Sequence, residues 1–169
     1  MDEYRRIDHP FDAVWNENSK ILILGSFPSV KSRDEMFFYA HPRNRFWTVM
    51  SNILGCKKPE TIDEKKKMLL ENNVALWDVI ASCDIVGSSD SSIKNVKAND
   101  IGFIIKNSRI NRVFTNGTTA YRLYKKYILP KTNIEAVLLP STSPANAVKN
   151  SDALTAEWKK IIGEVLYYD

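Results

Sequence analysis

The sequence predicts an α/β fold, a three-layer α/β/α sandwich with a central four-stranded parallel sheet. Three observations predict it: four short apolar runs typical of strands buried on both faces, a helical pattern after each run, and a polar loop where each run ends. Strands that alternate with helices are joined by right-handed crossovers, which make the sheet parallel and cover both of its faces. Residues 1–169 are predicted to form a single domain.

The first predicted strand is residues 20–25, and a long loop with several serines follows it. Phe11 and Trp15 precede this strand and are expected to cover the core from a loop or a short helix. The long loop ends where a helical spacing of apolar side chains predicts a helix over residues 45–54. Because loops at the carboxyl ends of buried strands hold the sites of open α/β folds, this loop is the first candidate site.

The next helix is predicted to begin at Thr61, because Thr-Ile-Asp-Glu has the form of a capping box. In that motif the Glu64 carboxylate reaches back to the Thr61 amide. Residues 74–79 are the second predicted strand, and residues 83–93 are expected to be a loop rich in small hydroxyl residues. The remaining predicted elements are a helix capped by Asn99 and ending at Lys106, a strand at 111–115, a helix at 118–128, a strand at 134–139 and a helix from Ser151.

Composition excludes several classes of protein. A hydrophobic content of 44% and a charged content of 26% are typical of a globular domain, and no apolar run reaches the roughly 18 residues of a membrane span. The first residues carry acids and no apolar segment, so a signal peptide is not expected. Cys56 and Cys83 form no close pair, which favours reduced thiols and a cytoplasmic location. No cluster of His and Cys suggests a metal, and the net charge of +4 is compatible with a polyanionic partner.

The loops after the four predicted strands are expected to meet at one edge of the sheet. They are rich in Ser, Thr, Asn, Gly and Pro, and poor in Lys and Arg. Small residues let a backbone approach a phosphate closely, and hydroxyls and amides donate hydrogen bonds to its oxygens. The alternative is that these residues only make turns. The loops are residues 25–29 and onward, 84–93, 116–119 and 140–147.

Four segments of the chain resemble the uracil-DNA glycosylase superfamily, and most closely its hypoxanthine-excising (deoxyinosine) branch. The first two are ILILGSFPS and YAHPRNRFW, which match the family's water-activating loop and the segment that follows it. The other two are LLPSTSPANA at residues 138–147, in the place of the second motif, and LWDVIASCDIVGSSDSSI at residues 76–93. The resemblance spans about residues 20–165, and the order and spacing of the segments carry it.

The sequence departs from the family pattern at two positions. Uracil-excising relatives place Asp, Asn or Glu third in the Gly-x-x-Pro motif, where this chain has Phe27. Relatives often carry His or Asn before the Pro-Ser of the second motif, where this chain has Leu139. The resemblance to the hypoxanthine branch implies that Asn44 takes over the catalytic role, by holding water or stabilising the departing base. The alternative is that Asn44 only caps the helix that begins at Arg45.

The resemblance also implies the rest of the site. Tyr39 would be the platform on which the flipped base stacks, and the alternative is that its ring is part of the core packing. Backbone groups near Gly25 would read the base edge, and His41 lies beside them but could simply shape the loop. The base-binding residues are therefore predicted to be Gly25, Ser26, Phe27, Tyr39 and His41. The residues predicted to bind DNA phosphates are Ser88, Ser89, Ser92, Ser141, Thr142 and Ser143, and no cofactor or metal is expected.

The sequence therefore predicts a DNA repair glycosylase that hydrolyses the N-glycosidic bond of a flipped-out deaminated base, most closely hypoxanthine, in double-stranded DNA. The enzyme is expected to be monofunctional, since Lys31 is the only lysine in the first two catalytic loops and a Schiff-base step has no evident nucleophile. It is also expected to be a monomer. Two alternatives stay open. One is a glycosylase for uracil or for G:U and G:T mismatches, and the other is a non-catalytic domain that binds nucleic acid or nucleotide on the same fold.

Overall fold

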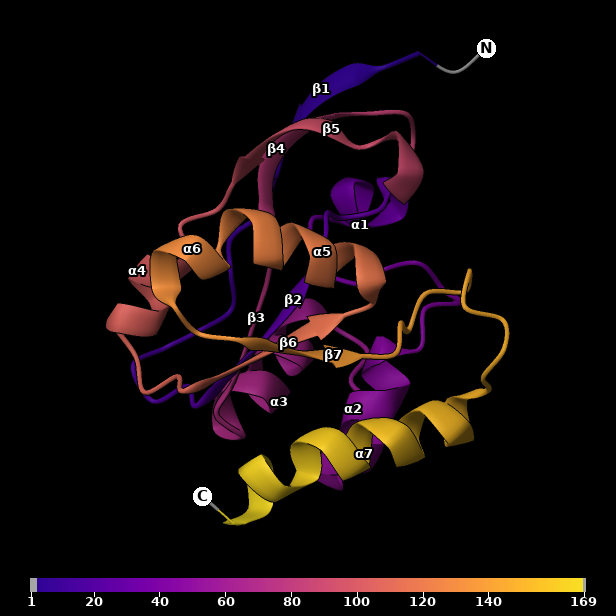
Figure 1. Ribbon diagram of the computed structural model, residues 1–169. Coiled ribbons are helices and arrows are strands. Elements are labelled where there is room, and N and C mark those ends of the chain that lie inside the picture. Colours follow the sequence, from indigo (N-terminus) through magenta and orange to yellow (C-terminus); the bar gives the residue numbers. More distant parts are fainter. Residues whose placement is uncertain (1–2, 169) are drawn as a thin grey trace.

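A computed structural model describes residues 3–168, so Met1, Asp2 and Asp169 of the predicted domain lie outside the described part. The strands form two sheets, one parallel and one antiparallel (Figure 1). The strands are β1 (Arg5–Asp8), β2 (Ile21–Gly25), β3 (Val74–Asp78), β4 (Ile80–Ile85), β5 (Lys94–Ala98), β6 (Arg112–Asn116) and β7 (Ala136–Leu139). The helices are α1 (Val30–Glu35), α2 (Phe46–Leu54), α3 (Ile62–Glu71), α4 (Ile101–Lys106), α5 (Thr118–Tyr127), α6 (Leu129–Thr132) and α7 (Ser151–Tyr168), with a short 3₁₀ turn, η1, at Asp90–Ser92.

The predicted four-stranded parallel sheet is confirmed, with the order β3-β2-β6-β7. Every residue of β2 is buried, because helices cover both faces. Ile21 and Ile23 point into a core shared with α2, α3 and α7, whereas Leu22 and Leu24 point into a core shared with α4, α5 and α6. Figure 1 shows the two helical layers on opposite sides of the sheet. This alternation is the period-2 pattern of a strand between two layers.

The second sheet was not predicted. β1, β4 and β5 form a three-stranded antiparallel sheet in the order β1-β4-β5, and it includes residues 83–85 of the segment expected to be a loop at 83–93. The rest of that segment is a loop, apart from the short turn η1. Residues 3–19 contribute the strand β1, with Arg5 paired to Ile85 far along the chain, and a loop that holds Phe11 and Trp15. Phe11 and Trp15 are partly buried against the two cores, as expected. The strand predicted at 74–79 ends at Asp78, and the chain turns directly into β4.

Helix ends follow the predicted chemistry in one case and depart from it in another. The Thr61 hydroxyl accepts from the Glu64 amide at 3.1 Å, and the Glu64 carboxylate accepts from the Glu60 amide at 2.8 Å. Backbone hydrogen bonds at Glu60 and Thr61 lower the pKa of Glu64. The cap of α4 is Asp100 and not Asn99, because the Asp100 carboxylate accepts from the Phe103 amide at 3.1 Å.

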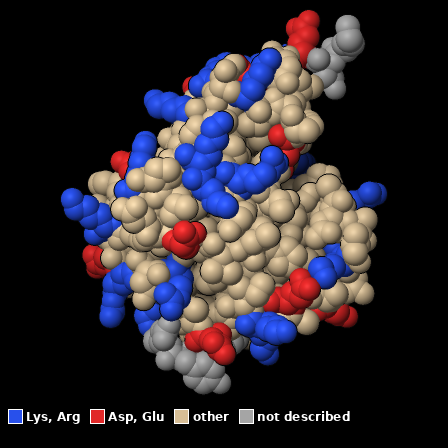
Figure 2. Space-filling view, viewed as in Figure 1, with Lys and Arg blue, Asp and Glu red and all other residues tan. Residues whose placement is uncertain are grey.

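The described chain has a basic surface over part of one face. Lys and Arg side chains gather in the upper part of the molecule, in the region of the small sheet and α5 (Figure 2). β1 and β5 carry Arg5, Arg6, Lys94 and Lys97. Among residues 3–168 no helix is both long and apolar enough to cross a membrane.

Candidate active site

A cavity of about 400 Å³ opens at the carboxyl ends of the parallel strands. Its wall comes from the four loops that the sequence predicts to meet there, so the predicted site residues other than Ser92 come together. They are Gly25, Ser26, Phe27, Tyr39, His41, Asn44, Ser88, Ser89, Ser141, Thr142 and Ser143. A larger and more open hollow of about 970 Å³ adjoins this cavity along β7 and α7. The smaller cavity is the candidate active site because it contains the buried polar groups described next.

Asn44 lies on the cavity wall just before α2. Its Oδ1 accepts from the Phe46 amide and from the Thr142 hydroxyl, both at 2.9 Å. The Phe46 bond fixes which amide atom is the oxygen, because a backbone N–H can only donate. The other amide atom, Nδ2, has no hydrogen-bond partner among residues 3–168. Asn44 therefore bonds the first turn of α2 through its oxygen and keeps two N–H donors uncommitted.

Thr142 and Asn116 hold Asn44 in this orientation. Asn116 Nδ2 donates to the Thr142 hydroxyl at 3.0 Å, and its Oδ1 accepts from the Thr142 amide at 3.0 Å. The Thr142 side chain is fully buried, and its hydroxyl both accepts from Asn116 and donates to Asn44. The prediction that Thr142 binds phosphate is corrected here: a buried hydroxyl with both bonds made orients Asn44.

Arg45 fastens the loop that carries Thr142, a role that the sequence did not suggest. Its guanidinium donates to the carbonyl oxygens of Ser143 at 2.7 Å and Asn146 at 2.8 Å, and also to that of Lys149. The Arg45 amide donates to the Thr142 carbonyl at 3.1 Å. A planar guanidinium with five donors suits such a set of carbonyls. Arg45 therefore fixes residues 142–149 against the start of α2.

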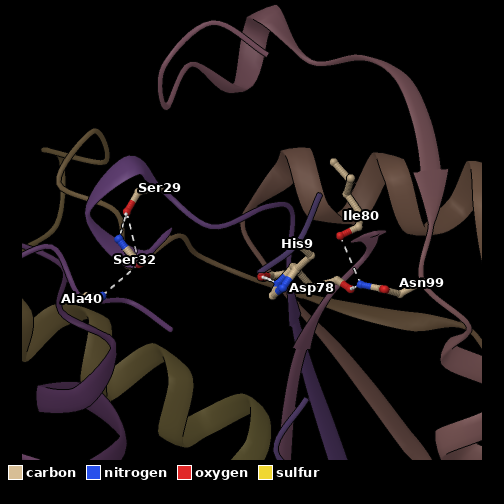
Figure 3. A network of polar contacts seen from close by, with 7 residues as sticks. All are labelled: His9, Ser29, Ser32, Ala40, Asp78, Ile80 and Asn99. Carbon is tan, nitrogen blue, oxygen red and sulfur yellow. Dashed lines mark hydrogen bonds and ion pairs between the residues drawn. The ribbon is translucent and has the colours of Figure 1, made fainter. Parts of the chain in front are cut away.

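Asp78 lines the floor of the cavity and forms a buried pair with His9, which is not part of the lining. His9 Nε2 lies 2.7 Å from Asp78 Oδ2, with side chains 4% and 5% exposed (Figure 3). Asn99 holds the backbone at this end of β3, because its Nδ2 donates to the carbonyl oxygens of Asp78 and Ile80 at 2.9 and 3.1 Å. Sequence reasoning missed the pair because its partners lie 69 residues apart. The only local signal was an acidic residue at the end of an otherwise apolar strand.

Tyr39 and Phe27 surround this floor. Tyr39 has a left-handed backbone with φ of 53°, uncommon for a bulky residue, and its ring stacks on Phe46 at a centroid distance of 4.3 Å. Burial, with the nearby negative charge of Asp78, raises the pKa of the Tyr39 hydroxyl. Phe27 packs edge-on against His9 at 5.9 Å. Whether Tyr39 also stacks on a base stays a prediction.

Gly25 lets these groups approach the backbone. A Cβ at this position would lie 2.5 Å from Asp78 Oδ1 and 3.0 Å from the Tyr39 hydroxyl, and the first distance is shorter than real contacts allow. Glycine is therefore required for the present arrangement of the floor. His41 is exposed, and its Nδ1 accepts from the Arg43 amide at 3.1 Å, in agreement with a role in shaping the loop.

The predicted phosphate-binding serines differ in whether their hydroxyl groups still have a proton to donate. Ser88 Oγ accepts from the Val30 amide at 2.8 Å and Ser141 Oγ from the Ser143 amide at 3.1 Å, so each hydroxyl keeps its proton to donate. Ser92 lies outside the cavity wall, and its hydroxyl bonds Val86 and donates to the Ser89 carbonyl at 2.7 Å. The Ser92 hydroxyl therefore stabilises the turn at residues 86–92. Within residues 3–168, no group of three or more His, Cys, Asp or Glu could hold a metal ion.

Comparison with known proteins places these features in a family context. The family model described as "Uracil DNA glycosylase superfamily" matches residues 13–166. A protein of Methanosarcina acetivorans named "Hypoxanthine DNA glycosylase" is 34% identical over 157 residues, covering 92% of this chain and 98% of that protein. A protein of Methanosarcina barkeri with the same name is 33% identical over 140 residues, covering 80% of this chain and 86% of that protein. A solution NMR structure of a candidate uracil DNA glycosylase from Methanosarcina acetivorans superposes with a TM-score of 0.76 at 32% identity, covering 89% of this chain and 93% of that one.

Proposed function

The chain belongs to the uracil DNA glycosylase superfamily, and we propose that it is a monofunctional DNA glycosylase that removes hypoxanthine from double-stranded DNA. Two similar relatives named for that activity support the substrate, and each covers at least 80% of this chain. The observation that carries the mechanism is the orientation of Asn44. Its oxygen is bonded to Phe46 and Thr142, which leaves its N–H donors for the reaction.

The reaction breaks the bond between the sugar C1′ and N9 of the base. The electron pair of that bond leaves with the base, and the sugar develops oxocarbenium character. Water adds its oxygen to C1′ and gives up a proton to solvent, and the released base takes up a proton. Negative charge therefore grows on the base. A positioned N–H donor in a partly closed cavity stabilises such charge without rearranging during the reaction.

This geometry favours one of the two roles considered for Asn44. An amide oxygen would have to accept a proton from the attacking water to polarise it, but Oδ1 already accepts two hydrogen bonds. Nδ2 can donate to the departing base. We therefore assign Asn44 to the leaving group, and Phe27, which cannot bind water, needs no catalytic role.

The DNA would lie across the loops that rim the cavity, with one nucleotide flipped into it. Ser88, Ser89, Ser141 and Ser143 line the cavity and can donate to phosphates, and the net charge of +4 favours a polyanion. We further propose a monomer that acts in the cytoplasm. The free thiols of Cys56 and Cys83 are consistent with a reducing compartment.

The test is an excision panel. Duplexes that carry a single hypoxanthine, uracil, xanthine or mismatched thymine are incubated with the protein in excess chelator, and alkali-sensitive sites are measured. We expect the fastest cleavage at hypoxanthine. Uracil is the second candidate, because the family description and the NMR structure both refer to it. Absence of cleavage in every duplex would leave a binding domain without glycosylase activity.

A further inference from the structure

The proposed reaction develops charge at two places, and Asn44 acts at one of them. Its N–H donors serve the negative charge that leaves with the base. The sugar becomes positive at the same time, because it develops oxocarbenium character. A negative group held in place near the sugar would stabilise that charge without rearranging during the reaction. A carboxylate at the mouth of the cavity, open to the substrate, is suited to this role.

Three acidic residues within residues 3–168 line the cavity or the adjoining hollow: Asp78, Asp90 and Glu157. Asp78 is 3% exposed at the floor and is bonded to His9. The Glu157 carboxylate forms a salt bridge with Lys149 Nζ at 2.9 Å. Asp90 lines both the cavity and the hollow, and it forms no salt bridge within the described residues. Asp90 is therefore the acid best placed to meet a positive charge on the substrate.

Asp90 is held at the boundary between the cavity and the hollow by the loops on either side. It begins the turn η1, and the Ser26 hydroxyl donates to its Oδ1 at 3.3 Å. From the other side, the Thr119 side chain in the first turn of α5 hydrogen-bonds to the same carboxylate. Asp90 nevertheless remains exposed, because its surface is open to the two hollowed regions. The carboxylate is thus fixed in position and still accessible to a substrate.

The groups around Asp90 determine the pH at which its carboxylate is charged. Burial between the loops raises the pKa of Asp90, and the hydrogen bonds from Ser26 and Thr119 oppose that rise. Of the charged groups nearby, Asp78 raises this pKa further and Arg122 lowers it. The carboxylate is negative above its raised pKa and neutral below it, so any effect of its charge should depend on pH.

A negative charge at this place opposes the binding of DNA. Ser88 and Ser89 immediately precede Asp90 and are proposed to donate to phosphates, which the carboxylate would repel. The charge becomes favourable when the sugar turns positive. An interaction that is stronger in the transition state than in the ground state accelerates the chemical step. A purely structural bond to Ser26 would not need the charge, because an asparagine oxygen accepts the same hydrogen bond.

We propose that Asp90 is a catalytic residue whose carboxylate faces the sugar of the flipped nucleotide and stabilises the positive charge that develops there. The inference rests on the proposed function. The carboxylate forms no bond to the sugar: water still adds to C1′, and the base still leaves with the electron pair. Asn44 and Asp90 therefore act on opposite charges, one on the departing base and the other on the sugar.

The test uses two duplexes that have no glycosidic bond to break. One carries a neutral tetrahydrofuran in place of the nucleoside, and the other carries a pyrrolidine, whose protonated ring nitrogen is positive as the sugar is during the reaction. We expect the wild type to bind the pyrrolidine duplex at least about tenfold more tightly. Asp90→Asn keeps an oxygen for Ser26 but loses the charge, so it should bind both duplexes about equally. The wild-type preference should also fall as the pH drops through the pKa of Asp90, since the amine stays protonated.

Single-turnover excision of hypoxanthine separates this role from a structural one. Asp90→Asn should react at least about tenfold more slowly, and it should need no more protein for half-saturation than the wild type because a repulsive charge is gone. Loss of a structural support would instead weaken binding. Asp84→Asn is the matched control: Asp84 lies in β4, lines neither the cavity nor the hollow, and accepts from Asn95 at 2.7 Å. Its removal takes away the same charge and should change neither the rate nor the preference.

The outcomes distinguish this inference from the proposed function. Absence of excision in every duplex of the panel contradicts the function, whereas the binding preference judges Asp90 without any cleavage. Equal binding of the pyrrolidine and tetrahydrofuran duplexes by the wild type overturns the inference, and this measurement needs no variant. A folded Asp90→Asn that keeps the wild-type preference overturns it as well.

Discussion

Replacement of Asn44 by aspartate separates catalysis from helix capping. Aspartate keeps an oxygen where Asn44 Oδ1 accepts from Phe46 and Thr142, and it replaces the Nδ2 donors with a second oxygen. A negative charge at the start of α2 is also favourable to the helix. Asn44→Asp should therefore fold as well as the wild type but lack the donor assigned to the departing base.

The expected magnitudes differ between variants. Loss of one preorganised donor costs on the order of 10²–10³ in rate, so Asn44→Asp should excise hypoxanthine that much more slowly. Asn44→Ala loses the same donor and also the acceptor, at about 1 kcal/mol for the cap and about 1–3 kcal/mol for the buried Thr142 hydroxyl left without its acceptor. Its thermal midpoint should fall by several degrees, since about 1 kcal/mol corresponds to about 2–4 °C at this size.

The assay is single-turnover excision of hypoxanthine from a duplex, with the thermal midpoint of each variant measured in parallel. Duplex affinity should survive in both variants, because the proposed phosphate contacts lie on other loops. If Asn44→Asp excises hypoxanthine at the wild-type rate, the donor role of Asn44 is wrong and Asn44 is a helix cap. Slow excision by a variant of wild-type stability supports catalysis.

Three further predictions follow from the contacts around the site. Arg45→Lys keeps the charge but has fewer donors for the carbonyls of residues 142–149, so amide exchange there should accelerate and the thermal midpoint should fall by at least about 3 °C; unchanged exchange would contradict the role of Arg45. Ser141→Ala should weaken duplex binding while the salt dependence stays shallow, because few charges contact the DNA, and unchanged affinity would remove Ser141 from the interface. Burial raises the pKa of Cys83 to about 11, so at pH 8 an alkylating reagent should label exposed Cys56 and reach Cys83 only after unfolding, as mass spectrometry can check.

The parallel sheet and the position of the site could be predicted from local patterns of residues. The strands β2 and β7, predicted at 20–25 and 134–139, could be found because apolar runs and turn residues are local signals that need no partner. The loops at their ends could then be placed together, because parallel strands all present their carboxyl ends to one edge. Asn44 was identifiable from its motif, but its orientation was not.

The second sheet and the polar contacts within the cavity depend on segments that are distant in the sequence, so no local pattern predicts them. β4 is a short segment of mixed polar and apolar residues, which is a weak strand signal. It forms a strand because it pairs with β1, which lies about half the chain length away in the sequence. The same holds for His9 on Asp78 and for Thr142 on Asn44, which are 69 and 98 residues apart in the sequence. A hydroxyl in a loop looks alike in sequence whether it faces solvent, as predicted for Thr142, or is buried with both bonds made. Packing of distant segments decides between the two, since a buried polar group is stable only where the fold brings it a partner.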